Sequence, residues 1–560
     1  ELNITSASTA DRGIGALLEQ GSIFTLGAGG KVDIGGTNNI GFYVKSGANL
    51  NVTGGTVTNT ASGVFAYLDN GNLHFTSGSP LNINFANVIV SGAAGNLLND
   101  TAITVGTSGL QGDSGATIVN SNLGTINGNV VNAKAMVGTG AGTTLTNAGT
   151  INLTGDTSIG MYTEDFAIGT SIGHVSVGDK SAAYYVGTDG VMNISGTASV
   201  GEDSTLLFGA GGSINYTGAN IVMSNKSIAL TLSDAASTVD FNNREVTTGT
   251  EGTGIFLTGT GDIANVTNLT KLKVQNKSTG IYMDNNTAMN TGINVDLTGT
   301  EAIGVFTTNN GNINYSGSML STTIKNKGII NTGTGTTLNS GNIQLTGDSS
   351  IGMYGENGTM INNSSVEVGN GAYTGLVLNS AVAMYGKNVT SVSNNGNIKI
   401  GTDAVGIFGE NTVVTNSSSI QSTGAKSTGI YGLQGSASNA GNIVLGDSSN
   451  GIFVKNGTMI INTGNITVGD NNSAGIYGAG TTSVQHNSGV ITAGKESVGI
   501  ATETGNILVG AGAVINAGTD SSYIYSASGT GINNANLSLS DHSIGLYTKS
   551  GTMINNASIT

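Results

Sequence analysis

Few side chains in this sequence could support catalysis or metal binding, and those few are widely spaced. The four histidines are His74, His174, His486 and His542, and no two of them stand at the spacing of metal ligands. The chain has no cysteine, which excludes disulfides, cysteine zinc sites and thiol catalysis. We therefore expect surface histidines, with no metal and no cofactor.

Residues 112–115 read GDSG, a tetrapeptide that resembles the nucleophile loop of chymotrypsin-like proteases. A protease of that kind also needs a histidine and an aspartate positioned against the serine in a globular domain. Turns with the pattern GD-x-S recur along the chain, at residues 155–158, 347–350 and 446–449. Because Gly112 stands near a turn, we interpret GDSG as one of these repeat turns, in the same register.

Enzymes with a β-helical fold that cut acidic polysaccharides are the main catalytic alternative. They use clustered aspartates for acid and base catalysis, or basic residues beside a metal. Here the acids are scattered, and the adjacent pairs Glu164–Asp165 and Glu202–Asp203 have no arginine near them in the sequence. We predict no catalytic residue and no enzyme activity, and we keep polysaccharide cleavage as a third alternative.

Two stretches have the composition of a recognition surface. Glu164, Asp165 and Phe166 stand where later repeats read Glu-Asn-Gly or Lys-Asn-Gly, and they combine acids with an aromatic ring as a neutral sugar or a protein hot spot would require. Tyr373 belongs to the one lengthened repeat, whose insertion near residues 370–380 predicts a surface loop. These four are the candidate binding residues, and loops without any partner are the alternative.

The charge of the chain argues against nucleic acid as a partner. The formal net charge is −15, and the 18 basic residues include two arginines, Arg12 and Arg244. Nucleic-acid binding needs a basic patch, and the sequence has no basic cluster. An acidic surface instead favours the solubility of a long molecule.

A repeat positions all of these residues. A triplet of a small, an apolar and an aromatic residue, as in Gly352-Met353-Tyr354, recurs through nearly the whole chain, in about 23 repeats of roughly 24 residues. The repeats are less regular in residues 1–148 and regular in residues 149–560. Short runs alternate apolar and polar residues, as at Ile343 and Leu345, between turns rich in Gly, Asn, Ser and Thr. This pattern predicts an all-β protein, a parallel β-helix with one repeat per coil.

Stacked coils bring equivalent residues together. Asparagines recur at Asn342, Asn397, Asn442 and Asn465, which predicts amide ladders along the β-helix. The aromatic residue of the triplet recurs in the same way. We expect it in a buried stack at a corner, and an exposed aromatic ladder is the alternative.

The motif SIGMYGENGTMINN, from residue 350, resembles the passenger domains of giant type V autotransporter adhesins, above all those of fusobacteria. The likeness covers most of residues 149–560 and extends more loosely to the first 150 residues. It implies a right-handed β-helix on the bacterial cell surface, anchored in the outer membrane by a C-terminal β-barrel. We expect a chain that lacks its export signal and that barrel. The resemblance assigns no binding residue.

The resemblance implies adhesion to a host-cell surface glycan or receptor protein, or to the surface of another bacterium, with roles in virulence and coaggregation. A passive stalk, which displays a binding region elsewhere in a longer chain, is the alternative. A stalk should be regular throughout, whereas this chain has an irregular first part, an acidic-aromatic loop and an insertion. We therefore favour adhesion.

Overall fold

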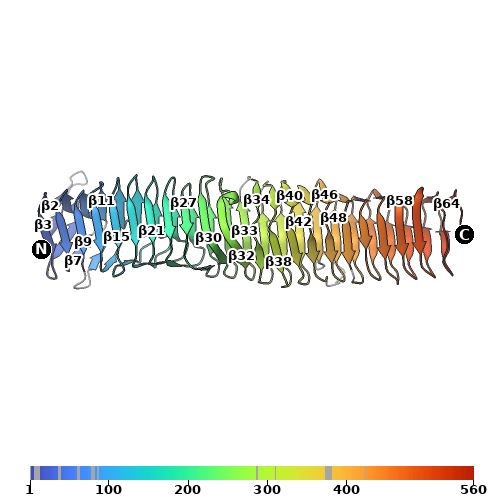
Figure 1. Cartoon of the computed structure of the whole chain (residues 1–560), viewed down its shortest axis with the longest axis horizontal. Helices are drawn as coiled ribbons and strands as arrows, with labels where there is room; N and C mark the ends of the chain where they lie inside the picture. Colours follow the sequence, from blue (N-terminus) through green and yellow to red (C-terminus); the bar gives the residue numbers. More distant parts are fainter. Residues whose placement is uncertain are drawn as a thin grey trace. The chain divides into compact units, whose positions relative to one another are not determined.

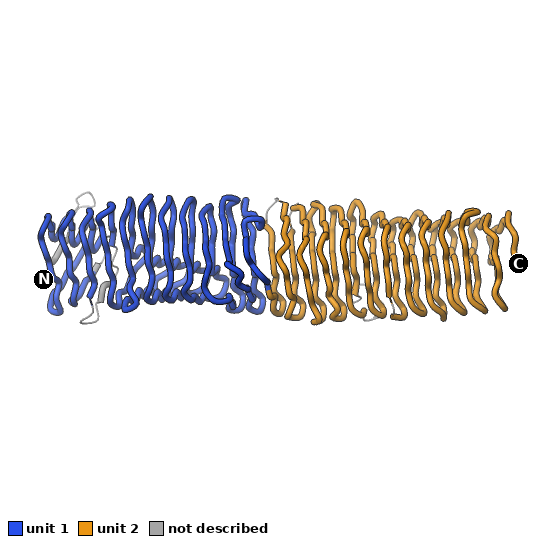
Figure 2. Tube along the Cα trace, viewed as in Figure 1, with its two compact units in different colours: residues 1–272 blue, residues 273–560 orange. Residues whose placement is uncertain are grey.

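The computed structural model describes residues 2–5, 13–35, 39–59, 63–76, 82–84, 88–284, 288–308, 311–371, 381–422 and 424–560. The chain divides into two compact units, unit 1 (Glu1–Leu272) and unit 2 (Lys273–Thr560), which Figure 2 distinguishes by colour. The insertion near residues 370–380, including Tyr373, lies almost entirely outside the described residues.

Each unit is a parallel β-solenoid, as the repeat predicts. Counted over both units, the chain makes about 21 turns of roughly 24 residues, close to the 23 predicted. In Figure 1 the strands of each unit lie side by side, one turn against the next. The described residues include a single short helix, the 3-10 helix η1 (Ile263–Asn265).

The first sheet of each unit holds the strand that carries the triplet. In unit 1 it consists of β2 (Ile14–Leu18), β5 (Ile40–Lys45), β8 (Val64–Asp69), β11 (Val88–Ser91), β14 (Leu110–Asp113), β17 (Lys134–Thr139), β20 (Ile159–Thr163), β23 (Ala182–Val186), β26 (Thr205–Gly209), β29 (Ile228–Leu232) and β31 (Thr253–Thr258). In unit 2 it consists of β33 (Thr279–Asp284), β36 (Ile303–Thr307), β39 (Lys327–Asn331), β42 (Ile351–Glu356), β45 (Val382–Lys387), β48 (Val405–Glu410), β51 (Thr428–Leu433), β54 (Asn450–Lys455), β57 (Ala474–Ala479), β59 (Val498–Thr502), β61 (Ser522–Ser526) and β63 (Ile544–Thr548).

The second row of strands follows the first within each turn. In unit 1 it consists of β3 (Ile23–Leu26), β6 (Asn49–Val52), β9 (Asn72–Phe75), β12 (Asn96–Asn99), β15 (Thr117–Asn120), β18 (Thr144–Asn147), β21 (Ile168–Ser171), β24 (Val191–Ile194), β27 (Ser213–Tyr216) and the start of β30 (Thr238–Thr247). In unit 2 it consists of β34 (Met289–Thr291), β37 (Ile313–Tyr315), β40 (Thr336–Asn339), β43 (Thr359–Asn362), β46 (Ser391–Asn394), β49 (Val413–Asn416), β52 (Ser436–Asn439), β55 (Met459–Asn462), β58 (Ser483–Ala493), β60 (Ile507–Ala517), β62 (Thr530–Asn533) and β64 (Thr552–Asn555).

The third row of strands completes each turn and is less continuous in unit 1. There it forms a four-stranded sheet of β1 (Leu2–Thr5), β4 (Lys31–Gly35), β7 (Thr56–Asn59) and β10 (Asn82–Asn84), and a five-stranded sheet of β13 (Ala102–Thr104), β16 (Thr125–Gly128), β19 (Thr150–Leu153), β22 (His174–Val177) and β25 (Thr197–Val200). β28 (Ile221–Val222) and β32 (Val266–Val274) follow. In unit 2 the row consists of β35 (Val295–Leu297), β38 (Ser318–Ser321), β41 (Asn342–Leu345), β44 (Val366–Val368), β47 (Ile398–Ile400), β50 (Ser419–Ser422), β53 (Asn442–Val444), β56 (Asn465–Val468) and the ends of β58 and β60.

The core of each unit is built from the alternating apolar residues that the sequence shows. Ile343 and Leu345 of β41 are fully buried, and the residues that pair with them in β44 are Val366 and Val368, which are buried as well. One turn has nowhere to bury such side chains alone, so each turn is stabilised by its neighbours. The predicted period-two strands are therefore confirmed.

The first residue of the triplet is usually glycine because the next turn approaches it closely. A Cβ atom on Gly352 would lie 2.6 Å from the carbonyl oxygen of Ala383, and one on Gly429 would lie 2.6 Å from that of Gly451. The turns can spread enough to accept alanine, which stands at the equivalent residues Ala183 and Ala383. Close contact between the turns is the physical reason for the glycine of the repeat.

Asparagine ladders exist, but not at the predicted residues. In unit 2 each amide donates from Nδ2 to the Oδ1 of the next turn at 2.7–2.8 Å, from Asn339 through Asn362, Asn394, Asn416 and Asn439 to Asn462, and all six are fully buried. The predicted residues Asn342, Asn397, Asn442 and Asn465 are exposed. They follow the ladder residues by three positions, across a corner where the chain changes direction.

The GD-x-S turn forms the corner before the first-sheet strand. Ser449, Ser473 and Ser497 are buried, and each Oγ accepts a hydrogen bond from the backbone N–H of the corner serine one turn earlier. The residue before each of these serines has a positive φ, 54° at Ser448 and 53° at Glu496. Each of these corners therefore holds at least one residue other than glycine in the left-handed conformation.

Candidate functional site

An outward aromatic stripe runs along the first sheet of each unit. Met353 is fully buried and Tyr354 is half-buried on the opposite face, because successive residues of a strand point to opposite sides of the sheet. The predicted buried stack at a corner is therefore wrong: the rings lie mid-strand on the outer face. The stripe consists of Tyr43, Tyr67, Tyr162, Tyr185, Phe208 and Phe256 in unit 1, and of Tyr282, Phe306, Tyr354, Tyr385, Phe408, Tyr431, Phe453, Tyr477, Tyr525 and Tyr547 in unit 2.

The rings of the stripe cover one another. Tyr162, Tyr185 and Phe208 stack with centroids 5.0 and 4.7 Å apart and with ring planes 15° and 9° from parallel. Such packing stabilises the turns and hides the ring faces from solvent. Where the rings stack in this way, a ligand that needs a flat aromatic face finds one at an interruption of the stripe.

Carboxylates line one edge of the stripe and accept hydrogen bonds from its tyrosines. Tyr385 Oη donates to Glu410 Oε2 at 2.8 Å, and Tyr477 Oη donates to Glu503 Oε1 at 2.8 Å. Glu503 Oε2 also accepts from the Gly480 N–H, and these hydrogen bonds lower the pKa of Glu503. Burial, and then the hydrogen bond to Glu503, raise the pKa of Tyr477 to about 12.

These tyrosines predict that the protein loses stability in alkali. Burial, and then the charge of Glu356, raise the pKa of Tyr354 to about 12. Between about pH 10 and pH 12 an unfolded chain has lost its tyrosine protons while the folded one keeps them, so the free energy of unfolding falls with rising pH in that window and is unaffected below it. We expect urea unfolding at pH 9 and about pH 11 to show this fall. The variant Tyr477→Phe should show a smaller fall, and equal stability at both pH values would contradict the prediction.

The predicted recognition residues lie at the corner that follows β20. Glu164 accepts a hydrogen bond from Tyr162 Oη and is partly buried, so it belongs to the edge of the stripe. Asp165 and Phe166 have φ values of 50° and 66°, and the Phe166 side chain is 62% exposed. Two consecutive left-handed residues, one of them bulky, are energetically unfavourable, and such strain is often found at functional sites.

The structure places GDSG differently from the sequence interpretation. Asp113 ends β14, and Ser114 and Gly115 form the corner after the strand, with φ values of 53° and 93°. The GD-x-S turns precede the first-sheet strand, so GDSG is a repeat corner but not the predicted one. The Asp113 carboxylate accepts from Ser91 Oγ at 3.0 Å.

All four histidines have a polar partner, and one of them corrects the expectation of surface histidines. His486 is fully buried, and its Nδ1 lies 3.1 Å from Asn462 Nδ2 at the end of the asparagine ladder. Burial lowers the pKa of His486, which therefore stays neutral and accepts this hydrogen bond. His74 lies 2.7 Å from Asp100, and His174 lies 2.8 Å from Thr197.

Several exposed carboxylates pair with lysines of neighbouring turns. Glu202 pairs with Lys226 at 3.3 Å, and Glu301 pairs with Lys325 at 3.6 Å, in both cases at exposed corners. Within the described ranges no three His, Asp or Glu side chains come close enough together to hold a metal ion. At these corners the carboxylates are compensated by lysines, and along the stripe carboxylates accept hydrogen bonds from tyrosines.

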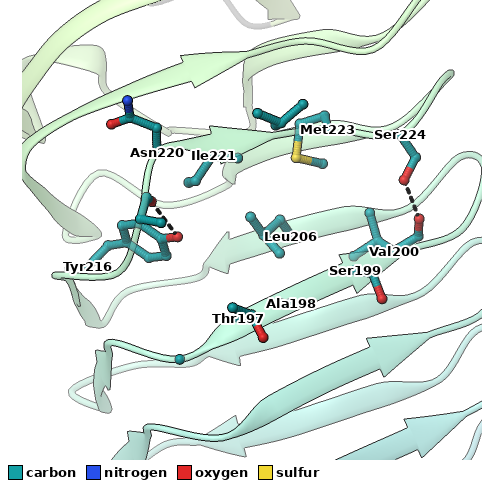
Figure 3. Close-up of a pocket in the computed structure, with 13 residues that line it drawn as sticks. Thr197, Ala198, Ser199, Val200, Leu206, Tyr216, Asn220, Ile221, Met223 and Ser224 are labelled. Atoms are coloured by element: carbon teal, nitrogen blue, oxygen red, sulfur yellow. Dashed lines mark hydrogen bonds between the residues drawn. The ribbon is translucent and has the colours of Figure 1, made fainter.

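A cavity of about 220 Å³ opens in unit 1 where the five-stranded sheet ends at β25 (Figure 3). Leu206, Ile221 and Met223 line it, and Ser224 Oγ bridges the gap by donating to the Val200 carbonyl oxygen at 2.8 Å. Tyr216 Oη donates to the Ala219 carbonyl oxygen at 2.9 Å at the other end. The lining includes no carboxylate, lysine or histidine, so the cavity offers apolar contacts and no acid–base chemistry.

Two comparisons of the sequence with known proteins were negative. No protein-family model matches the sequence, and no curated protein matches it. Among the described residues there is no helix of the length and apolarity needed to cross a membrane.

Proposed function

We propose that this chain is the adhesive part of a bacterial cell-surface protein, displayed outside the outer membrane, that binds a host-cell glycan or receptor or the surface of another bacterium. The observation that carries the proposal is Phe166. Its ring is 62% exposed at a corner where the repeat elsewhere uses Asn-Gly, and its backbone is held at a φ of 66°. A large exposed ring kept in a strained conformation contributes nothing to stability, which favours recognition.

The surroundings of Phe166 support the same proposal. Ile168 and Ile172, on the next strand and just after it, are 43% and 57% exposed, which extends the apolar surface beyond the corner. Glu164 and Asp165 supply carboxylates beside it. A few exposed apolar side chains rimmed by charge are typical of a protein or glycan contact. Tyr373, the other predicted binding residue, stays a prediction.

Restoring the repeat consensus at this corner should separate binding from stability. We expect the double variant Asp165→Asn, Phe166→Gly to be more stable than the parent by about 1 kcal/mol, because glycine removes the left-handed strain of phenylalanine. If the corner is the contact surface, the same variant should lose at least tenfold in binding. The measurement is flow cytometry of the purified, labelled chain on host cells and on a panel of bacteria, beside thermal unfolding.

A matched control is available in the same unit. Leu123 is 68% exposed at another turn and does not have a positive φ, so Leu123→Ser removes a similar apolar side chain without altering backbone strain. Binding should survive this change. Binding that survives both variants would place the contact surface elsewhere, and a folded parent chain that binds no cell would contradict adhesion.

The second candidate is a passive stalk that displays a binding region lying elsewhere in a longer protein. The continuous asparagine and serine ladders of unit 2 favour it, because they link each turn to the next and stiffen the unit. A stalk predicts no saturable binding at all, so the cytometry experiment distinguishes the two functions. Polysaccharide cleavage remains the third candidate.

A further inference from the structure

The aromatic stripe of unit 2 is interrupted at Ala501. In the strand register Ala501 pairs with Tyr477 on one side and with Tyr525 on the other. Tyr525 stacks on Tyr547 with centroids 5.3 Å apart and planes 15° from parallel, so one of its faces is covered by a ring and the other lies toward the alanine. Successive turns are about 4.8 Å apart, so a turn without an aromatic ring leaves a gap of about that height between the rings of the turns on either side.

An open recess of about 340 Å³ occupies this place on the outer face. Its floor is apolar, one wall is an aromatic ring, and its rim is polar: the lining includes Val498, Ala501, Tyr525, Asn472, Glu496 and Asp520. The three rim residues are corner residues with φ values of 62°, 53° and 58°, which hold their side chains outward over the strand. The volume falls at the lower end of small-molecule sites, about 300–1,000 Å³.

The other interruptions of the stripe differ from this one. Between Tyr67 and Tyr162 in unit 1 the equivalent residues are Ile89, Gln111 and Val137, whose side chains are all larger than that of alanine. Thr231 lies between Phe208 and Phe256 in unit 1, and Ile330 lies between Phe306 and Tyr354 in unit 2. Both side chains are larger than that of alanine; they are 3% and 7% exposed, and Ala501 itself is 5% exposed. Ala501 therefore differs by its short side chain, which lies on the floor of the open recess.

The charges at the rim favour a neutral ligand over a cation. Lys495 Nζ lies 3.3 Å from Glu496 Oε1 and 3.9 Å from Asp520 Oδ2, so a lysine already compensates both carboxylates. His542 Nδ1 lies 3.8 Å from Asp520 Oδ1 on the other side. A cationic ligand would compete with Lys495. A polyhydroxylated ligand can instead donate to the carboxylates and accept from Lys495 and Asn472.

We propose that this recess binds one pyranose ring of a neutral carbohydrate, which takes the place of the missing aromatic ring. The apolar C–H face of the sugar packs on Tyr525, because the ring face is electron-rich and attracts C–H groups. The hydroxyl groups at the opposite edge bond to Glu496, Asp520 and Asn472. The proposal rests on the proposed function in that it names a carbohydrate as the ligand class, but it concerns a different surface from the Phe166 corner.

Filling the recess tests the proposal directly. The probes are the methyl pyranosides of glucose, galactose, mannose and N-acetylglucosamine, with ethylguanidinium as a cationic probe, each titrated into the whole chain by saturation-transfer NMR. We expect at least one glycoside to bind with a dissociation constant of about 1 mM, as a single ring in an open site would. The variant Ala501→Tyr completes the stripe and should weaken this binding at least tenfold. The control Ile330→Tyr completes the stripe elsewhere and should leave binding unchanged.

Three outcomes would contradict the proposal. Failure of all four glycosides to bind the parent chain, or equal binding by the parent and by Ala501→Tyr, would overturn it. Ethylguanidinium binding that disappears in Ala501→Tyr, with no glycoside bound, would assign the recess to cations. If Ala501→Tyr does not fold by circular dichroism, Tyr525→Leu removes the stacking face and should weaken glycoside binding to the same extent.

Cell binding separates this proposal from the proposed function. Glycoside binding in a chain that binds no cell would keep the recess and reject adhesion. If Ala501→Tyr loses glycoside binding but still binds cells, both the carbohydrate recess and adhesion are retained, and the adhesive contact lies on another surface. Cell binding without any glycoside binding would reject the recess and keep adhesion.

Discussion

Replacing Asn439 by leucine will destabilise the turns around it by about 4 kcal/mol, because several buried hydrogen bonds are lost and polar partners are left unpaired. Asn439 Oδ1 accepts from Asn416 Nδ2 at 2.7 Å, and Asn439 Nδ2 donates to Asn462 Oδ1 at 2.8 Å. Leucine has the same branched shape at Cγ but forms neither hydrogen bond, so one N–H of the Asn416 amide is left buried without its acceptor. The amide is fully buried, and water cannot replace the missing partner.

The measurement for Asn439→Leu is native-state hydrogen exchange, because a solenoid can open locally and exchange reports which turns have been destabilised. Amides of β49, β52 and β55 should exchange much faster, while those of β63 should not change. The matched control is Asn442→Leu, three residues further along the same turn, where the side chain is exposed. Equal protection in the two variants would show that the ladder contributes nothing to stability.

Gly429→Val will destabilise unit 2 by about 3 kcal/mol, because the added side chain has no space. A Cβ atom at Gly429 would lie 2.6 Å from the Gly451 carbonyl oxygen and 2.8 Å from Ile443 Cγ2. The oxygen belongs to the backbone of the next turn, so relief requires that β51 and β54 separate. Gly429→Ala should cost much less, about 1 kcal/mol, since alanine occupies the equivalent position in other turns.

The control for Gly429→Val is Gly512→Val in the same unit. A Cβ atom at Gly512 would come no closer than 3.9 Å to its nearest neighbour, the Asn487 carbonyl oxygen. Because valine favours strands and Gly512 lies in β60, this substitution should leave the stability unchanged or raise it slightly. Thermal unfolding followed by circular dichroism measures both variants. A Gly429→Val chain as stable as its Gly512→Val counterpart would contradict the close approach of the turns.

The sequence predicts the fold because one signal repeats many times. The alternation at Ile343 and Leu345 determines which side chains of a strand point inward, and a stack of equal turns follows from the period. The asparagine ladder is predicted three residues too late in each turn, because the alternation of inward and outward side chains does not continue across a corner. Asn439 and Asn442 recur with the same period, but Ala440 and Gly441 turn the chain between them, and only the folded structure shows which one faces the core.

The candidate sites are formed by residues of different turns. A single sequence does not show which of these residues lie next to one another. The acidic-aromatic corner at Glu164 to Phe166 was visible because it departs from the repeat, and the structure adds its strained backbone. The recess at Ala501 was missed, although the break in the aromatic cadence at that residue was a usable signal. Its rim comes from three successive corners, at Asn472, Glu496 and Asp520, and their proximity follows only from the strand register.

The asparagine ladder of unit 2 gives this stack of turns a polarity. Every amide donates toward the C-terminal neighbour, from Asn339 to Asn462, and none donates backward. A partly folded stack would therefore have a free amide N–H at its last folded turn and a free amide oxygen at its first folded turn. A turn that adds at the C-terminal end must accept a hydrogen bond, whereas a turn that adds at the N-terminal end must donate one. Neutral His486 ends this series by accepting the last hydrogen bond at Nδ1, and an amide bond of the same direction returns further along the unit, from Asn533 to Asn555.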